Sequence, residues 1–152
     1  MINNRYSPPQ RKNMRIIPLG GCGEFGINCT IYQEDNKFVV VDVGALFPDP
    51  EQLGVSTIIP DVKGVFKKLG YLQAYIITHG HLDHIGALPH VYAECPAPIY
   101  ATPWTYEMIK RQFKKYHLPI KHLNKVEAGQ SVYCNPFSIQ YIHVNHSIPD
   151  AA

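Results

Sequence analysis

Hydrophobic and polar positions alternate along much of this chain from Arg15 onward, which is the pattern of half-buried β-strands. The polar pair Asp35-Asn36 separates two such runs and predicts a hairpin between them. Residues 74–78, Ala-Tyr-Ile-Ile-Thr, are typical of a buried strand and lead directly into His79. The strands expected on this basis cover residues 15–19, 28–34, 37–43, 74–78, 98–101, 131–134 and 137–144.

Three helices are expected between these strands. Asp61 is placed to cap a helix that extends through Leu69, a second helix covers residues 85–94, and Pro103 opens a third that extends to about residue 116. The third helix is amphipathic, so its basic face is expected to be exposed and remote from the metal site described below. Its apolar stripe comprises Tyr106, Ile109, Phe113 and Tyr116, and its basic face comprises Lys110, Arg111, Lys114 and Lys115.

Residues 1–13 show neither helical nor strand periodicity and are expected to form a flexible basic arm. Its basic residues could contact a polyanion, but a solvated tail is the preferred interpretation. Residues 14–152 are expected to form one globular unit, because the chain is 45% hydrophobic. A net charge of +2 indicates neither a nucleic-acid partner nor a membrane surface by itself. Four scattered cysteines, without a signal segment or an apolar span, indicate free thiols, a cytoplasmic location and no membrane contact.

The strongest chemical motif is the sequence His-Gly-His-Leu-Asp-His at positions 79–84, where the buried strand is followed by a helix. Histidines at i and i+2 of an extended segment point to the same side, so His79 and His81 can share a metal, while Asp83 and His84 face a neighbouring position. The alternative is a polar loop whose histidines only form hydrogen bonds. Gly80 is expected to prevent crowding of the metals, although a glycine also suits any tight turn.

A second candidate ligand follows the last expected strand. His146 in the sequence Asn-His-Ser-Ile-Pro-Asp can reach the metal held by His79 and His81, which would leave one position for water, as catalytic zinc requires. Without its context, such a histidine is more often structural. The remaining histidines lack this context and are interpreted as structural: His90, His117, His122 and His143.

These motifs resemble the metallo-β-lactamase superfamily, and the flanking sequence is similar to its ribonuclease J-like group. The HxHxDH motif is shared across the superfamily, whereas the loop pattern GGxGExGxN together with HSIPD is typical of that group. The matching stretches are residues 19–28, 41–44, 47–48, 59–61, 78–89 and 145–150.

The resemblance implies an α/β (α+β) fold, namely the N-terminal half of an αββα sandwich, truncated before the second half, the β-CASP domain and the C-terminal domain. It implies a zinc-dependent ribonuclease with 5′-to-3′ exonuclease and endonuclease action, RNA as partner and two zinc ions in an intact site. Because the remaining ligands are expected to be missing, we expect one zinc or none here, little turnover, and self-association through an uncovered sheet face. The alternatives are a non-catalytic interaction module and another hydrolase of the superfamily.

The resemblance also implies individual roles. His79, His81 and His146 would bind one zinc, while Asp83 and His84 would help to bind the other, and Asp83 would also act as the catalytic proton acceptor. Asp42 is expected either to support the metal loop or to be a simple turn residue after a strand. Glu24 and Asn28 are expected to hold the glycine-rich loop. This loop satisfies neither the Walker A pattern nor the Rossmann GxGxxG pattern, so nucleotide binding is not expected there.

Overall fold

The computed structural model describes residues 13–152, so the arm expected at residues 1–13 lies, apart from exposed Asn13, outside the described residues. The helices are α1 (Lys63–Leu69), α2 (Leu82–Ile85), α3 (Leu88–Glu94) and α4 (Pro103–Lys115). The strands are β1 (Met14–Gly20), β2 (Cys29–Glu34), β3 (Lys37–Val41), β4 (Tyr71–Ile76), β5 (Ile99–Ala101), β6 (Leu123–Lys125), β7 (Ser131–Cys134) and β8 (Phe137–Gln140).

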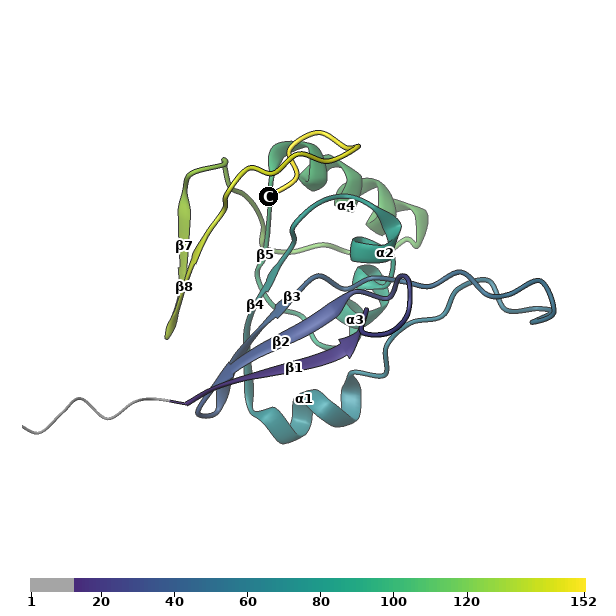
Figure 1. The fold of residues 1–152 in the computed structure, drawn as a ribbon, viewed down its shortest axis with the longest axis horizontal. Helices are drawn as coiled ribbons and strands as arrows, with labels where there is room; N and C mark the ends of the chain where they lie inside the picture. The colour runs from purple at the N-terminus through teal and green to yellow at the C-terminus, as the bar shows by residue number, and fades with distance from the viewer. Residues whose placement is uncertain (1–12) are drawn as a thin grey trace, which may run out of the picture.

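Six of the strands form one mixed sheet in the order β1-β2-β3-β4-β5-β6 (Figure 1). The predicted hairpin is present: β2 pairs with β3 in antiparallel register, with Tyr32 opposite Val39. From β3 onward the pairs are parallel. Because parallel strands end at the same edge of a sheet, the residues that follow β3 and β4 meet there.

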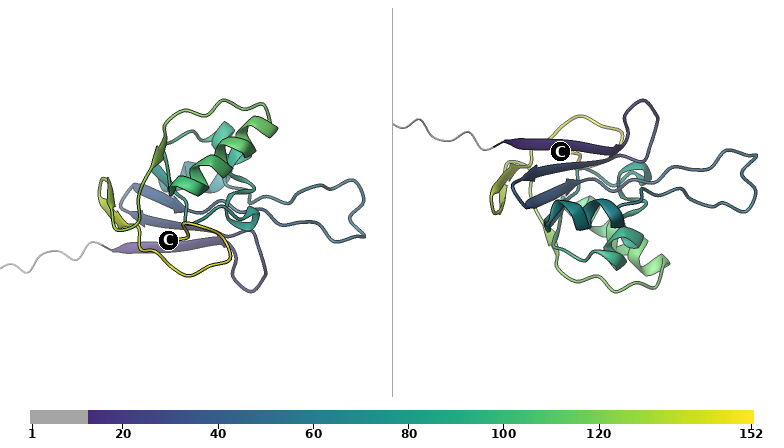
Figure 2. Two further views of the ribbon diagram at one scale, coloured as in Figure 1. Left: turned by 90° about the horizontal axis from the view of Figure 1, so that it is seen from above. Right: turned by 90° about the horizontal axis from the view of Figure 1, so that it is seen from below.

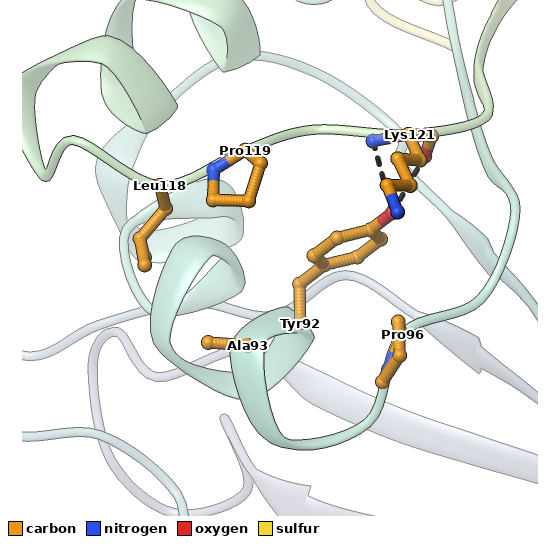
Figure 3. Close-up of a pocket in the computed structure, with 6 residues that line it drawn as sticks. All are labelled: Tyr92, Ala93, Pro96, Leu118, Pro119 and Lys121. Carbon is orange, nitrogen blue, oxygen red and sulfur yellow. Dashed lines mark hydrogen bonds between the residues drawn. The ribbon is translucent and has the colours of Figure 1, made fainter.

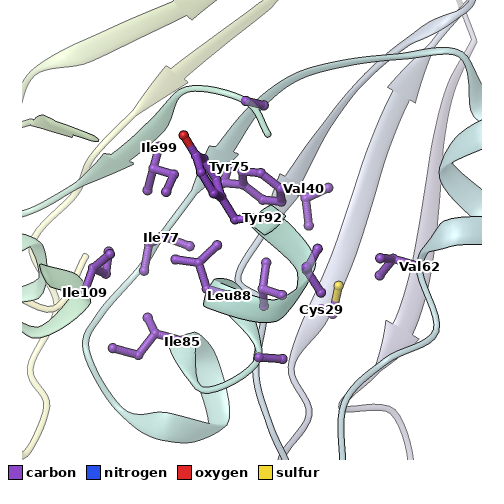
Figure 4. Close-up of a cluster of buried hydrophobic side chains, with 14 of the residues drawn as sticks. Cys29, Val40, Val62, Tyr75, Ile77, Ile85, Leu88, Tyr92, Ile99 and Ile109 are labelled. Carbon is purple, nitrogen blue, oxygen red and sulfur yellow. The ribbon is translucent and has the colours of Figure 1, made fainter. Parts of the chain in front are cut away.

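The two faces of this sheet are covered differently (Figures 1 and 2). Phe38 and Val40 point to the face that carries the helices, whereas Val39 and Val41 point to the face on which the β7-β8 hairpin packs. The core beneath the helices is the larger one and includes Tyr75, Ile77, Leu88, Ile99 and Ile109 (Figure 4). A helix layer, a central sheet and strands beyond it confirm the predicted α/β class.

Several predicted boundaries are wrong for identifiable reasons. The helix expected to begin at residue 85 begins at Leu88 as α3, separate from α2, because Ala87 N donates to Val43 O and Pro89 has no amide hydrogen to continue the ladder from α2. Asp61 does not cap α1, whose N-cap is Val62 without a side-chain hydrogen bond. The expected strand over residues 74–78 is β4, which covers Tyr71–Ile76.

The last strand is also shorter than predicted. β8 ends at Gln140, because Tyr141 pairs with the turn that precedes β7: its amide donates to Gln130 O and its carbonyl accepts from Gly129 N. The three-residue strand β6 was not predicted, since its sequence Leu-Asn-Lys lacks an apolar alternation. Within residues 13–152, no helix has the length and apolar character needed to cross a bilayer.

Candidate metal centre

The candidate site lies at the edge of the sheet where β3 and β4 end (Figure 1). Asp42 directly follows β3, and Thr78 and His79 lie shortly after β4. The chain then continues through His81, which is the N-cap of α2 with extended backbone. The parallel pairing of β3 with β4 therefore places Asp42 beside the motif at positions 79–84.

Three histidines converge at this edge. Their potential ligand atoms, in His79, His81 and His146, all lie within 4.8 Å of one another. The closest pair is His79 Nε2 and His81 Nδ1, 3.1 Å apart. Nitrogens that bind one tetrahedral zinc at about 2.0–2.1 Å are separated by about 3.3 Å, so the pair of His79 and His81 has the separation that a shared ion needs.

The proton positions also suit metal binding at His79. The single hydroxyl hydrogen of Thr78 is donated to Asp42 Oδ2 at 2.8 Å, so His79 Nδ1, 3.0 Å from that hydroxyl oxygen, is the donor in their contact. This arrangement leaves the lone pair of His79 Nε2 directed at His81. Burial, together with the neighbouring His84, His146 and His81, lowers the pKa of His79 to about 4, so the ring is neutral at pH 7.

Asp42 connects the strand edge to the motif. Its carboxylate accepts hydrogen bonds from the backbone N–H and hydroxyl of Thr78, and from His84 Nδ1 at 2.8 Å. Burial lowers the pKa of His84, but the hydrogen bond to Asp42 and the charges of Asp42 and Asp83 outweigh it, so the pKa is raised overall. Asp42 also turns the chain with a positive φ of 59°, but its contacts with Thr78 and His84 make it more than the simple turn residue of the alternative interpretation.

Asn28 reaches the motif from the other side. Its side-chain amide donates to the backbone oxygen of Asp83 at 3.0 Å and to Asp83 Oδ2 at 3.2 Å, and lies 3.1 Å from His84 Nε2. Gly44 allows the Asp83 backbone to lie this close, because a Cβ at position 44 would come within 1.7 Å of the Asp83 backbone oxygen. Asn28 thus holds the motif as well as the loop, whereas Glu24 is exposed and forms no hydrogen bond or ion pair with residues 13–152.

Asp83 and His84 form a second pair of donors next to the three histidines. Asp83 Oδ2 lies 3.4 Å from His84 Nε2, and the rings of His79 and His84 are centred 4.0 Å apart. Within the described residues, the cluster of His79, His81 and His146 is the only group of three or more potential ligands. Asp83 and His84 therefore lie next to the three histidines and present two potential donor atoms.

His146 is held less firmly than His79. It lies in an exposed segment, and its Nδ1 accepts a hydrogen bond from the Ser147 N–H at 2.7 Å. A neutral ring in this arrangement carries its proton on Nε2, so metal binding requires one of these two nitrogens to change its partner. The segment is anchored where Trp104 N donates to Asp150 Oδ2 at 2.9 Å and Ala152 N donates to Thr78 O at 3.1 Å.

Two further observations concern the surroundings of the motif. A side chain at Gly80 would contact Met108 and Ile148 at 3.2–3.4 Å, so this glycine allows α4 to pack against the loop. The basic face of α4 is exposed as predicted, and Lys115 lines a hollow with Leu82, which lies between His81 and Asp83, whereas none of the five candidate ligands lines this hollow. Sequence reasoning missed Thr78, although its hydroxyl directly precedes the motif.

Other features of the sequence lie away from this centre. His90 packs its ring on Tyr116, with the centroids 4.5 Å apart, and all four cysteines are free as predicted. An apolar pocket between α3 and the segment before β6 is lined by Tyr92, Pro96, Leu118 and Pro119 (Figure 3). The Tyr92 hydroxyl donates to the backbone oxygen of Lys121 at 2.6 Å and accepts from its N–H at 3.1 Å, so these residues join the two segments.

Comparison with known proteins agrees with this geometry. The family model described as beta-lactamase superfamily domain matches residues 50–151. Ribonuclease J of Sinorhizobium meliloti is 37% identical over 147 residues, which cover 93% of this chain and 26% of the relative. Ribonuclease J of Mycobacterium tuberculosis is 34% identical over 139 residues, which cover 91% of this chain and 25% of the relative.

The chain thus spans about a quarter of the length of these curated relatives. Among solved structures, MIM-2 metallo-β-lactamase superposes with a TM-score of 0.59 at 17% identity, covering 83% of this chain and 48% of that protein. This likeness concerns the fold alone. The resemblance inferred from the motifs is confirmed, and the chain belongs to the beta-lactamase superfamily as a ribonuclease J-like member with a metallo-β-lactamase fold.

Proposed function

We propose that this chain is the metal-binding part of a zinc-dependent hydrolase that cleaves RNA phosphodiesters, with the exonuclease and endonuclease action expected for its family. The observation that supports this proposal is the convergence of His79, His81 and His146 from two distant segments, with ligand atoms within 4.8 Å. The similarity to proteins named ribonuclease J supports RNA as the substrate.

Zinc suits these donors because neutral imidazole nitrogens in a tetrahedral arrangement are among its usual ligands. In our proposal His79, His81 and His146 hold one ion, and Asp83 and His84 contribute to an adjacent position. When bound, metal ions at such sites polarise the phosphoryl oxygen and lower the pKa of water.

Residues of this chain would hold Asp83 and His84 in position for this reaction. Asn28 donates to Asp83 Oδ2 at 3.2 Å, so the carboxylate is held beside the metal position and can accept a proton from the attacking water. Asp42 accepts from His84 Nδ1, which directs His84 Nε2 toward the neighbouring position.

Only one of the two positions has three donors among residues 13–152. Two donors are too few for a tight zinc site, and hydrolysis of the phosphodiester is proposed to need both ions. We therefore expect at most one firmly bound zinc per chain and negligible hydrolysis of RNA by this chain alone.

Metal analysis tests the assignment directly. The purified chain is dialysed after exposure to zinc, and its metal content is measured by plasma mass spectrometry. We expect no more than one equivalent, with a sharp loss in His81→Ala and no loss in His143→Ala, which removes an exposed histidine near His146 that lies outside the cluster. Two retained equivalents, or full retention by His81→Ala, would contradict the proposed ligand set.

A hydrolysis assay tests the second part. The zinc-loaded chain is incubated with end-labelled single-stranded RNA, and products are separated on a denaturing gel. We expect no cleavage above that of the Asp83→Asn variant. Cleavage that Asp83→Asn abolishes would support Asp83 as the proton acceptor and would contradict the expectation that this chain alone is inactive.

A further inference from the structure

The positive charge of the chain is concentrated in one segment. Residues 103–125, which comprise α4 and the connection through β6, contain six basic residues and one acidic residue, and thus carry +5 in a chain whose net charge is +2. Lys110 and Lys125 both pair with Glu107, at 3.1 and 3.6 Å, and both lie over the ring of Tyr106. The charges left without an acidic partner within residues 13–152 are those of Arg111, Lys114, Lys115 and Lys121.

Three of these charges lie close together on α4. Arg111, Lys114 and Lys115 are exposed and separated by three and four positions, so they repel one another. The negative end of the helix dipole stabilises Lys114 and Lys115 in the last turn, but Arg111 lies before that turn. A bound polyanion would relieve this repulsion between the three like charges, so the cluster of cations favours a polyanionic ligand.

α4 also borders the metal loop along its length. At its beginning, Trp104 N donates to Asp150 Oδ2 at 2.9 Å, which ties it to the segment that contains His146 (Figure 1). In its middle, a Cβ at Gly80 would contact Met108 at 3.2 Å. Near its end, Lys115 shares a hollow with Leu82.

The residues at positions 104, 108, 111 and 115 follow the i, i+4, i+7, i+11 spacing of one helix row. Met108 packs beside Gly80 and Lys115 lines a hollow with Leu82, so Arg111, which lies between them on this row, belongs to the same side of the helix. Trp104 begins the row with 47% of its surface exposed, although a large apolar ring is normally buried. The row thus combines an exposed aromatic ring with cations on the side of α4 that faces the loop of the motif.

We propose that this row, formed by Trp104, Arg111 and Lys115, binds single-stranded RNA and directs it to the metal loop. Trp104 stacks on a base, while Arg111 and Lys115 contact phosphates. Aromatic stacking combined with a basic track is the usual way in which proteins bind single strands without sequence preference. An acidic protein would satisfy the cations but has no bases for Trp104 to stack on. This inference rests on the proposed function, because it concerns the same substrate.

Trp104 is the only tryptophan of the chain, so its intrinsic fluorescence reports on this row alone. The chain is titrated with unlabelled single-stranded RNA in the presence of EDTA, so neither metal nor hydrolysis contributes. We expect saturable quenching by the single strand and little quenching by duplex RNA, whose bases are already stacked. Absence of quenching by the single strand would overturn the proposal.

Variants are compared by the anisotropy of labelled RNA. Arg111→Glu with Lys115→Glu should weaken binding at least about tenfold and reduce the salt dependence of the affinity, by about 0.7 in slope for each lost phosphate contact. Trp104→Ala should weaken binding by about fivefold or more, as expected when one base loses its stacking partner. The matched control is Lys67→Glu with Lys68→Glu, which makes the same charge change on exposed positions of α1, at the opposite end of the molecule from the loop that contains His146 (Figure 1).

The outcomes separate this inference from the proposed function. If the α1 variant weakens binding as much as the α4 variant, or if heparin quenches Trp104 as RNA does and Trp104→Ala binds normally, the contact is non-specific attraction and the row is not an RNA site. A chain that holds zinc but shows no quenching would overturn this inference alone. A chain that shows the expected quenching but retains two equivalents of zinc, or retains its zinc fully in His81→Ala, would overturn the proposed ligand set and leave the RNA surface supported.

Discussion

At the scale of single residues, Asp42 joins the end of β3 to the motif. Its carboxylate is buried and accepts three hydrogen bonds, two from Thr78 and one from His84. Hydrogen bonds to charged groups contribute more than neutral ones, and a buried donor that loses its partner is costly. Asp42 therefore stabilises the fold and orients a proposed ligand at the same time.

Replacing Asp42 by asparagine tests its structural contribution. Asparagine tolerates the positive φ at this position, so the substitution changes mainly the charge and the hydrogen bonding. We expect the free energy of unfolding in urea to fall by about 2–3 kcal/mol, since an amide cannot accept from all three donors. Asp49→Asn, at an exposed position, should change it by less than about 0.5 kcal/mol, and an equal loss in both variants would contradict the argument.

The free cysteines should differ in reactivity. Burial, reinforced by the charge of Asp42, raises the pKa of the Cys29 thiol to about 12, so at pH 8 only about one molecule in ten thousand carries its thiolate. Cys22 is exposed in the glycine-rich loop. Brief treatment of the folded chain with iodoacetamide should therefore modify Cys22 and spare Cys29 in peptide mass spectra. Comparable modification of both would show that β2 opens readily.

At the scale of elements, two glycines give opposite predictions. Gly64 lies in α1, and no atom comes within 4 Å of the position that a Cβ would occupy there, so Gly64→Ala should stabilise the chain by about 0.5–1 kcal/mol. Gly44→Ala should destabilise it by about 3 kcal/mol or more, because the added carbon meets the Asp83 backbone. Thermal unfolding of the two variants measures both effects, and a shift in the same direction for both would contradict the packing described around Asp83.

The elements also show which parts of the fold the sequence could predict. The hairpin of β2 and β3 and the long helix α4 were predicted because their apolar periodicity extends over many residues. The division between α2 and α3 was missed because periodicity continues across it, while Pro89 and the hydrogen bond from Ala87 N to Val43 O separate the two helices. β6 was missed because it is a strand by virtue of its pairing with β5, which no local pattern reveals.

The candidate site was predictable to a similar extent. The histidines at positions 79, 81 and 84 are adjacent in sequence, so their spacing alone indicated shared chemistry. The contacts of Asn28 with Asp83, and of Asp42 with His84, join segments far apart in the chain and needed the sheet to be assembled before they became visible. The same is true of Trp104 and Asp150, which connect α4 to the segment of His146.

At the scale of the whole molecule, the sheet is covered unevenly. The β7-β8 hairpin packs on Val39, Ala74 and Ile76 in the middle of one face. β1 lies at the end of the strand order, so one of its edges has no neighbour within the described residues. Met14 and Ile16 on this strand are 52% and 62% exposed. An edge strand with exposed apolar side chains favours pairing with another chain.

We therefore expect this chain to self-associate as its concentration rises, through residues 14–17 of β1. Pro18 cannot donate to a ladder and should limit the pairing to that part of the strand. Sedimentation velocity over a wide concentration range should show a rising weight-average mass for the unmodified chain and a constant monomer mass for Met14→Lys with Ile16→Lys, because lysines on an edge oppose strand addition. The matched control is Leu53→Lys with Val55→Lys, which removes two exposed apolar residues from the loop before α1 and should leave association unchanged. A monomer at every concentration would contradict the expectation, and loss of association only in the loop variant would assign the contact to that loop instead of β1.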